Sequence, residues 1–362
     1  MQDDLKLAAY HYDLPERNIA QFPADKRDHS RLLALNRRTG VIEHLHFHQI
    51  TGLFNPGDLL VLNDTRVFPA RLHGRKESGG RVEVFLLGYP VSVGLAAADS
   101  RSTHFRCEAL IKSSRPPKEG SVIQITPQGS CVMLEDRARG RWLVELIANP
   151  PASLESLLDA SGEVPLPPYI KREAGSADSD RQRYQTVYAN QPGAIAAPTA
   201  GLHFTKDLIA KLEAEGVRTA PVTLHVGYGT FAPVQENDIS KHRIHREYIE
   251  ISESTVEMVN KTKDAGAKIW AVGTTTVRAL ESSVDQDQRL LPVRDWCDLY
   301  ITPGFTFRVI DNLITNFHLP ESSLLFLVAA LCGRETLLAS YREAIARDYR
   351  FYSYGDAMVI ID

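Results

Sequence analysis

The pattern of apolar and polar positions divides the chain into a strand-rich first part and a second part in which helices alternate with strands. Residues 31–35 and 41–47 are apolar stretches on either side of an Arg-Thr-Gly turn at 38–40, and this pattern predicts a hairpin. Residues 58–64 predict a buried strand. From residue 66 to 149, short apolar segments are separated at near-regular spacing by Gly, Pro and Ser. Several short strands at that spacing predict a small barrel or sandwich.

After residue 150 the pattern changes to alternating helices and strands. Residues 153–161, 205–215, 252–266 and a segment that starts at Thr274 predict helices, and residues 219–226 and 268–272 predict strands. Ser153 and Thr205 are expected N-caps, and residues 175–181 are an expected surface loop. We therefore expect an α/β fold: a mixed-sheet α/β domain of residues 1–65 and 150–362, with an inserted small β-barrel domain of residues 66–149.

The composition is that of an ordinary globular protein, with 43% hydrophobic and 24% charged residues among 362. This length favours two domains, because single cores rarely grow beyond about 250–300 residues. No apolar run approaches the roughly 18 residues of a membrane span, and residues 1–10 lack the apolar core of a secretory signal. We expect a cytoplasmic protein without membrane association.

Metal binding is not favoured by the residues that could support it. The four cysteines are scattered, with no CxxC pair, so neither a zinc ribbon nor an iron–sulfur cluster is indicated. His44, His46 and His48 alternate along one predicted strand, where an exposed strand face is favoured over a metal site. We expect no metal ligands.

The distribution of charge is more informative than its sum. The net charge of −4 does not favour nucleic-acid binding, but from Arg66 to Arg141 there are 13 Lys and Arg against 7 Asp and Glu. A basic module inside an acidic chain fits docking to phosphates. The solvated face of a small β domain explains the same excess equally well.

The most informative local pattern is a buried strand, residues 268–272, that runs through a glycine into three threonines at the start of a helix. The start of a helix offers free N–H donors and the positive end of a dipole. Hydroxyl groups there, with Arg278 one turn later, would complete a pocket for an anion or carboxylate. A well-capped turn from strand to helix is the alternative. The threonines are Thr274, Thr275 and Thr276.

Histidines stand at the ends of several predicted elements. His203 precedes a helix within a rigid, turn-rich segment, and His318 lies in an Asn-Phe-His-Leu-Pro segment. His225 lies on a strand whose end permits close approach of a ligand to the backbone, because Gly227, Tyr228 and Gly229 follow it. For each histidine a structural role is the alternative.

Two further polar segments complete the candidate site. Residues 349–358 hold three tyrosines, Tyr354 among them, and a phenylalanine around Arg350 and Asp356. Aromatic rings beside arginine suit stacked bases or a sulfonium cation. The segment at the junction with the predicted barrel is also polar, although it directly follows a buried strand. It begins with Asn63, Asp64 and Arg66. Fingerprints of dinucleotide-binding proteins and serine hydrolases are missing.

Seven segments, in order along nearly the whole chain, resemble the S-adenosylmethionine:tRNA ribosyltransferase-isomerase family of queuosine biosynthesis. Thr276 and Glu321 differ from the family pattern, which has Ser and Lys there, and residues 89–102 are an expected insertion. The matching segments are Tyr12-Asp-Leu-Pro-Glu-Arg-Asn-Ile-Ala-Gln, Leu62-Asn-Asp-Thr-Arg-Val, Ala197-Pro-Thr-Ala-Gly-Leu-His-Phe, Leu224-His-Val-Gly-Tyr-Gly-Thr-Phe, Val272-Gly-Thr-Thr-Thr-Val-Arg, Thr315-Asn-Phe-His-Leu-Pro and Tyr352-Ser-Tyr-Gly-Asp-Ala-Met.

The resemblance implies a reaction, a fold and partners. The family transfers and isomerises the ribosyl group of S-adenosylmethionine onto 7-aminomethyl-7-deazaguanine at the wobble position of tRNAs with GUN anticodons, which gives epoxyqueuosine, adenine and methionine. It combines an α/β domain with a β-barrel. S-adenosylmethionine is then a consumed cosubstrate, and we expect no permanently bound cofactor and a monomer.

The resemblance also implies roles for the candidate residues. Because the sulfonium acidifies the neighbouring carbon, the reaction needs a general base, for which His203 and His225 are the candidates. Arg278 with Thr274 and Thr275 would hold the carboxylate or the ribose, and residues 352–356 would flank the base. A non-catalytic RNA-binding protein and a methyltransferase of unusual fold are the alternatives.

Overall fold

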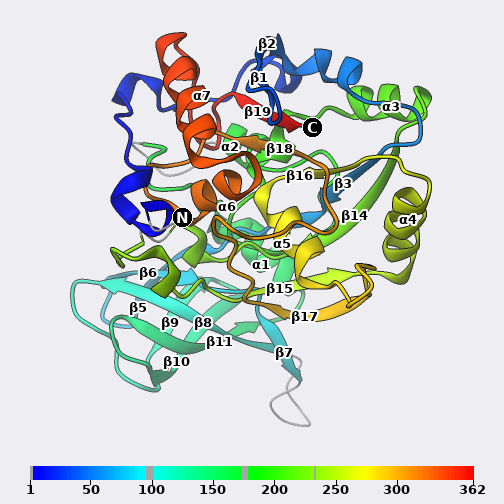
Figure 1. The fold of residues 1–362 in the computed structure, drawn as a ribbon. Coiled ribbons are helices and arrows are strands. Elements are labelled where there is room, and N and C mark those ends of the chain that lie inside the picture. The colour runs from blue at the N-terminus through cyan, green and yellow to red at the C-terminus, as the bar shows by residue number, and fades with distance from the viewer. Residues whose placement is uncertain (1–2, 95–101, 173–177, 232–233) are drawn as a thin grey trace.

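A nine-stranded mixed sheet forms the centre of the protein, and a β-barrel lies beside it, below the sheet in Figure 1. The computed structural model describes residues 3–94, 102–172, 178–231 and 234–362. The order of strands in the sheet is β17-β15-β14-β3-β16-β18-β19-β1-β2. These strands are β1 (Arg31–Asn36), β2 (Ile42–His46), β3 (Leu59–Asn63), β14 (Arg218–Leu224), β15 (Glu247–Ile251), β16 (Ile269–Val272), β17 (Val293–Cys297), β18 (Asn312–Asn316) and β19 (Ala357–Ile361).

Four neighbouring strands at the centre of the sheet, β14, β3, β16 and β18, run parallel. Their carboxyl ends therefore meet at one edge. Next to them, β19 runs antiparallel to β18 and parallel to β1, while β15, β17 and β2 add antiparallel pairs on the two flanks. The predicted mixed-sheet α/β class is confirmed.

Both faces of the sheet are covered, as the nearly continuous apolar strands require. Along β3, Leu59 and Val61 face a core shared with α4, α5, α6 and α7, whereas Leu60 and Leu62 face a core shared with α3 and a 3₁₀ helix, Phe47–Leu53. The expected cap at Thr205 is confirmed, because its hydroxyl accepts from the Leu208 N–H at 3.1 Å. The helices are α3 (Lys206–Ala214), α4 (Glu253–Asp264), α5 (Thr274–Ser282), α6 (Ser323–Cys332) and α7 (Arg334–Ala346).

Six antiparallel strands close into a barrel in the order β11-β10-β9-β5-β6-β8, and β8 pairs again with β11. Alternate residues of β11, such as Trp142, Val144 and Leu146, point into its core, which helix α1 also covers. The barrel strands fall within residues 71–148, and the division into domains at residues 66 and 149 stays a prediction. The elements are β5 (Arg71–Lys76), β6 (Arg81–Leu86), β7 (Val91–Gly94), β8 (Thr103–Ser113), β9 (Val122–Thr126), β10 (Gly129–Asp136), β11 (Arg141–Ala148), α1 (Leu154–Ser161) and β12 (Gly162–Glu163).

Two short strands connect the barrel to the sheet. In this link β4 (Thr65–Val67) pairs in parallel with β13 (Gln191–Ala194). After the barrel, β12 returns to pair with β5. The chain therefore enters and leaves the barrel on the same side.

The structure corrects two expectations of local structure. The loop expected at 175–181 contains the start of helix α2 (Asp178–Arg183), which is fixed because Asp180 pairs with Arg172 at 2.9 Å. His48 is not on a strand with His44 and His46: β2 ends at His46, whose N–H donates to the Gln49 side chain and begins the 3₁₀ helix. Of the expected insertion at 89–102, residues 95–101 lie outside the described residues.

No single helix in the described ranges is long and apolar enough to cross a membrane. Helices α6 and α7 meet such a requirement only as a pair bent by 112°.

Candidate functional site

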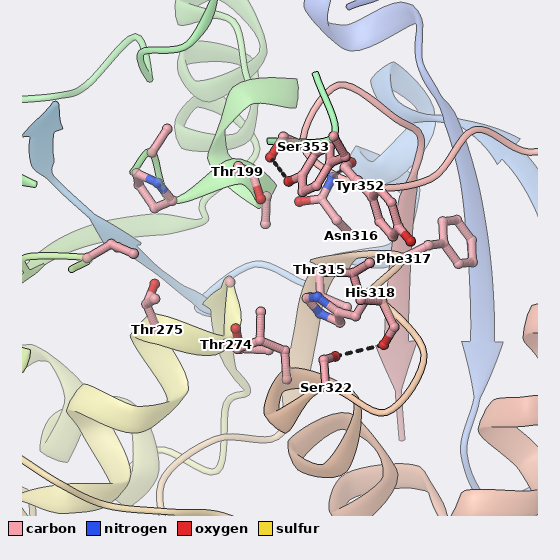
Figure 2. Close-up of a pocket in the computed structure, with 18 of the residues that line it drawn as sticks. Thr199, Thr274, Thr275, Thr315, Asn316, Phe317, His318, Ser322, Tyr352 and Ser353 are labelled. Atoms are coloured by element: carbon pink, nitrogen blue, oxygen red, sulfur yellow. Dashed lines mark hydrogen bonds between the residues drawn. The ribbon is translucent and has the colours of Figure 1, made fainter. Parts of the chain in front are cut away.

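A cavity of about 230 Å³ opens where the parallel strands end. Thr274 follows β16, Asn316 ends β18, and Val226 follows β14, so three neighbouring strands contribute to it. Open α/β sheets usually bind ligands at this edge. Figure 2 labels much of its polar lining: Thr199, Thr274, Thr275, Thr315, Asn316, His318, Ser322, Tyr352 and Ser353. Tyr169 and Glu321 also line the cavity.

The N-terminus of α5 forms one wall of the cavity. Gly273 has a φ of +89°, a value that favours glycine, and this lets β16 turn directly into the helix. No described side chain caps α5, so its first N–H groups and the positive end of its dipole are available to an anion. Thr274 and Thr275 line the cavity, whereas Thr276 does not, and its hydroxyl donates to the Val272 carbonyl at 2.7 Å.

His318 is the predicted histidine that lines the cavity. Its Nε2 lies 2.9 Å from the Thr315 hydroxyl. Its backbone is held at both polar atoms: the His318 N–H donates to the Tyr341 hydroxyl at 3.0 Å, and the Tyr12 hydroxyl donates to the His318 carbonyl. Burial lowers the pKa of His318 to about 3, so the ring is neutral at physiological pH. A neutral imidazole in a cavity can accept a proton or a hydrogen bond.

His203 lies behind the wall of the cavity and does not line it. Its Nδ1 is 2.7 Å from the Ser30 hydroxyl and its Nε2 is 3.1 Å from Nδ2 of Asn316. Burial, aided by the charges of Arg350 and Arg27, lowers its pKa to about 3. The expectation that His203 faces a ligand as a general base is therefore not supported by its position.

His225 belongs to a second group of polar side chains, outside the cavity. Its Nδ1 lies 2.8 Å from the Thr65 hydroxyl, and its ring fills the space that a Cβ at Gly193 would occupy. Burial lowers its pKa. In the same group, Asp64 accepts from the Thr223 hydroxyl at 2.6 Å. These contacts connect β4 and β13 to the sheet.

Asn63 lies between the cavity and this second group. It is fully buried, and its Oδ1 accepts from the N–H groups of Leu224 and Thr65. Its Nδ2 donates to the Leu224 carbonyl and, at 3.3 Å, to the Thr275 hydroxyl. Asn63 thus supports a residue of the cavity without lining it.

Arg278 does not line the cavity, although Thr274 and Thr275 of the predicted anion pocket do. It is 4% exposed, pairs with Glu247, and donates to the Leu299 carbonyl at 3.0 Å. The other oxygen of Glu247 accepts from the Gly227 N–H at 3.0 Å. The partner of Arg278 is thus a carboxylate of the protein itself, and the pair holds the Gly-Tyr-Gly segment in place.

The remaining predicted residues also lie outside the cavity. Asp356 is 1% exposed and accepts from the N–H groups of Arg31 and Arg350 and from the Arg350 guanidinium, while Tyr354 donates to Asp180 at 2.9 Å. In this segment Tyr352 and Ser353 line the cavity instead.

The Gly-Tyr-Gly segment and Arg66 lie outside the cavity as well. Tyr228 is 53% exposed and its ring packs 5.6 Å from that of Phe85 on the barrel. At Gly229 a Cβ would collide with the ring of His245. Arg66 lines a different cavity, of about 720 Å³, beside β4, α1 and α2.

Tyr352 and Ser353 fall within the segment 352–356 that is expected to flank the base, whereas sequence reasoning does not single out Thr199, Thr315 or Asn316. Each lies in a segment that carries the family resemblance. The sequence does contain one signal for Asn316. It is a polar residue at the end of an apolar stretch, two residues before His318.

The barrel carries a basic groove. Arg75 and Arg81 lie directly opposite each other on β5 and β6, and both line the groove with Lys112. Like charges opposed on a sheet repel each other, so this arrangement gains from a bound anion such as phosphate.

Throughout the residues that the structure describes, no group of three His, Cys, Asp or Glu side chains could hold a metal ion. His44 contacts the Tyr349 hydroxyl at 2.8 Å and Glu343 at 3.5 Å. All four cysteines are free thiols.

Comparison with known proteins gives a consistent result. A family model described as queuosine biosynthesis protein matches residues 7–360. A protein of Desulfotalea psychrophila named S-adenosylmethionine:tRNA ribosyltransferase-isomerase is 54% identical over 100% of this chain and 99% of its own, and a Geotalea uraniireducens protein of the same name is 48% identical over 98% and 100%. The crystal structure of S-adenosylmethionine tRNA ribosyltransferase from Thermotoga maritima matches with a TM-score of 0.52 and 33% identity, over 98% of this chain and 100% of that one.

Proposed function

This chain belongs to the S-adenosylmethionine:tRNA ribosyltransferase-isomerase family of queuosine biosynthesis, and we propose that it transfers and isomerises the ribosyl moiety of S-adenosylmethionine onto 7-aminomethyl-7-deazaguanine in tRNA. The acceptor is the wobble base of tRNAs with GUN anticodons. The products are epoxyqueuosine-tRNA, adenine and methionine. S-adenosylmethionine is consumed, and the enzyme is a cytoplasmic monomer without a permanent cofactor.

The cavity at the carboxyl edge of the sheet is the observation that carries this proposal. It combines the uncapped start of α5 with the hydroxyl groups of Thr274 and Thr275, which suits the carboxylate of the methionine part. Tyr169 and Tyr352, whose ring centroids are 4.6 Å apart, line the same cavity and suit a planar base.

We assign proton transfer to His318. The sulfonium makes the adjacent ribosyl carbon acidic, and a group in the cavity must take its proton. Because the lowered pKa keeps the ring of His318 neutral, it is in the protonation state that a proton acceptor requires. His203 supports the wall of the cavity, and Arg278 positions the Gly-Tyr-Gly segment through Glu247.

The basic groove of the barrel is the proposed docking surface for tRNA. Arg75, Arg81 and Lys112 would contact backbone phosphates, and such contacts make affinity depend on salt. Arg137 is a less suitable phosphate ligand because it already pairs with Glu108 and Glu135.

The test is a product assay with S-adenosylmethionine and tRNA that carries the deazaguanine precursor. Release of adenine and methionine, with the expected gain in tRNA mass, supports the proposal. Formation of S-adenosylhomocysteine would indicate a methyltransferase, and tRNA binding without turnover would indicate an RNA-binding protein. His318→Gln should stop turnover, whereas His46→Gln, a control on the exposed end of β2, should not.

A further inference from the structure

Asn316 combines deep burial with an unpaired oxygen. It is 3% exposed and lines the cavity, and its Oδ1 has no hydrogen-bond partner among the described residues. A buried acceptor without a partner is costly, so an unpaired acceptor on a residue that lines a cavity indicates a ligand that donates a hydrogen bond to it. In Figure 2 the Asn316 side chain lies beside Tyr352, on the wall opposite Thr274.

The orientation of the Asn316 amide is determined by its neighbours. Its Nδ2 lies 3.3 Å from the Tyr352 carbonyl, which can only accept, so the NH₂ group must be on that side. The same NH₂ faces His203 at 3.1 Å, which makes Nε2 of His203 the acceptor. The proton of His203 is then on Nδ1 and points to the Ser30 hydroxyl, which donates to the Arg27 carbonyl at 3.3 Å.

This chain of hydrogen bonds ends on a backbone carbonyl at both ends, and every donor in it has an acceptor. A flipped amide would place two acceptors against each other at Tyr352. The ring of His203 is fixed in turn by stacking on Phe47, at 5.1 Å between centroids. Asn316 is therefore locked with Oδ1 as its one unused hydrogen-bonding atom.

We propose that Oδ1 of Asn316 accepts a hydrogen bond from a neutral amino group on a planar heterocycle bound in the cavity, and that His203 is the positioning residue that holds it for this purpose. The inference rests on the proposed function, which supplies two such groups: the 6-amino group of adenine and the 2-amino group of the deazaguanine. Arg27 and Arg350, which lie near His203, disfavour an ammonium ion here. The neighbouring rings of Tyr169 and Tyr352 favour a flat base over a sugar.

Substrate analogues test the proposal and distinguish the two sources. In the 6-oxo (inosine) analogue of S-adenosylmethionine, a hydrogen-bond acceptor replaces the 6-amino group of adenine. In tRNA with the corresponding deazahypoxanthine, the 2-amino group of the deazaguanine is absent. The wild-type enzyme should prefer one of the natural substrates over its analogue by about tenfold or more in kcat/KM, since the analogue loses a hydrogen bond and, for the 6-oxo compound, places two acceptors against each other. Asn316→Ala should reduce that preference to within about twofold.

Asn18 offers a matched control. It is also 3% exposed, donates through Nδ2 to a backbone carbonyl, that of Tyr349, and has an unpaired Oδ1, but it does not line the cavity. Asn18→Ala should leave both preferences unchanged. If Asn316→Ala keeps the wild-type preference for both substrates, the proposal is overturned. A wild-type enzyme that releases no adenine would instead overturn the proposed function.

Variants of His203 keep the test decisive if Asn316→Ala does not fold. His203→Gln can still accept from Asn316 and donate to Ser30, so the preference should persist. His203→Leu removes the acceptor and lets the amide rotate, so the preference should fall while the KM for the other substrate stays unchanged. Equal preferences in the two His203 variants would contradict the positioning role.

Discussion

Lowering the pH should destabilise this protein through its buried neutral histidines, and His203 is the clearest case. Burial and the charges of Arg350 and Arg27 lower its pKa to about 3, whereas the unfolded chain has the ordinary value of 6.5. Below pH 6.5 the unfolded state therefore binds a proton that the folded state does not bind. The free energy of unfolding is highest above pH 6.5 and falls as the pH drops from 6.5 toward 3.

The magnitude follows from the same two values. Each pH unit in this window corresponds to about 1.4 kcal/mol for one histidine, so a change from pH 7.5 to pH 5.5 should cost about 1.4 kcal/mol through His203 alone. His318 adds a similar amount, because burial lowers its pKa to about 3 as well. Carboxylates and other groups also contribute to the total, so only a comparison with a variant isolates His203.

The assay is urea unfolding of wild type and His203→Gln at both pH values. Glutamine preserves the two hydrogen bonds, to Ser30 and Asn316, but does not titrate. The wild type should lose about 1.4 kcal/mol more than the variant between pH 7.5 and 5.5. An equal loss in the two proteins would show that His203 takes up a proton in the folded state, and the burial argument would be refuted.

Three further predictions concern the proposed site and its supports. The pH profile of kcat/KM for adenine release should have no inflection near pH 6.5, because the pKa of His318 is lowered to about 3 and its ring stays neutral from pH 5 to 8. An inflection near pH 6.5 would contradict the assignment of His318 as the proton acceptor. Arg278→Met should lower stability by roughly 3–5 kcal/mol, since it removes the charged partner of the buried Glu247 carboxylate, and thermal unfolding measures this loss. Normal stability together with lost binding of S-adenosylmethionine would instead indicate that Arg278 contacts the ligand. Charge reversal at Arg75 and Arg81 should raise the KM for tRNA but not that for S-adenosylmethionine, and equal effects on both would argue against docking at the groove.

Sequence reasoning succeeded where the signal is local. The caps at Ser153 and Thr205 and the turn from β16 into α5 were predicted because the residues that form each of them are adjacent in the chain. Helix α6 gave no such signal: it is buried on almost all sides and its residues are apolar throughout, so no amphipathic period marks it.

What the sequence could not predict about the site depends on contacts between residues that are distant in the chain. The sequence does not reveal the partner of Arg278, because Glu247 precedes it by 31 residues and lies on β15, whereas Arg278 is on α5. His203 suits a base by residue type, but the contacts that give it a supporting role involve Ser30 and Asn316, far away in both directions. Likewise, only tertiary structure reveals that the Asn316 oxygen is unpaired.

The position of β19 has a consequence for how the protein is made. This strand inserts between β18 and β1, so the hairpin of β1 and β2, synthesised near the start, joins the sheet only through a strand synthesised almost a chain length later (Figure 1). Contacts of such long sequence separation form slowly, because the entropy of closing the loop must be overcome first. Until residues 357–361 have been synthesised, the nascent hairpin therefore has an unpaired strand edge, and such an edge favours aggregation.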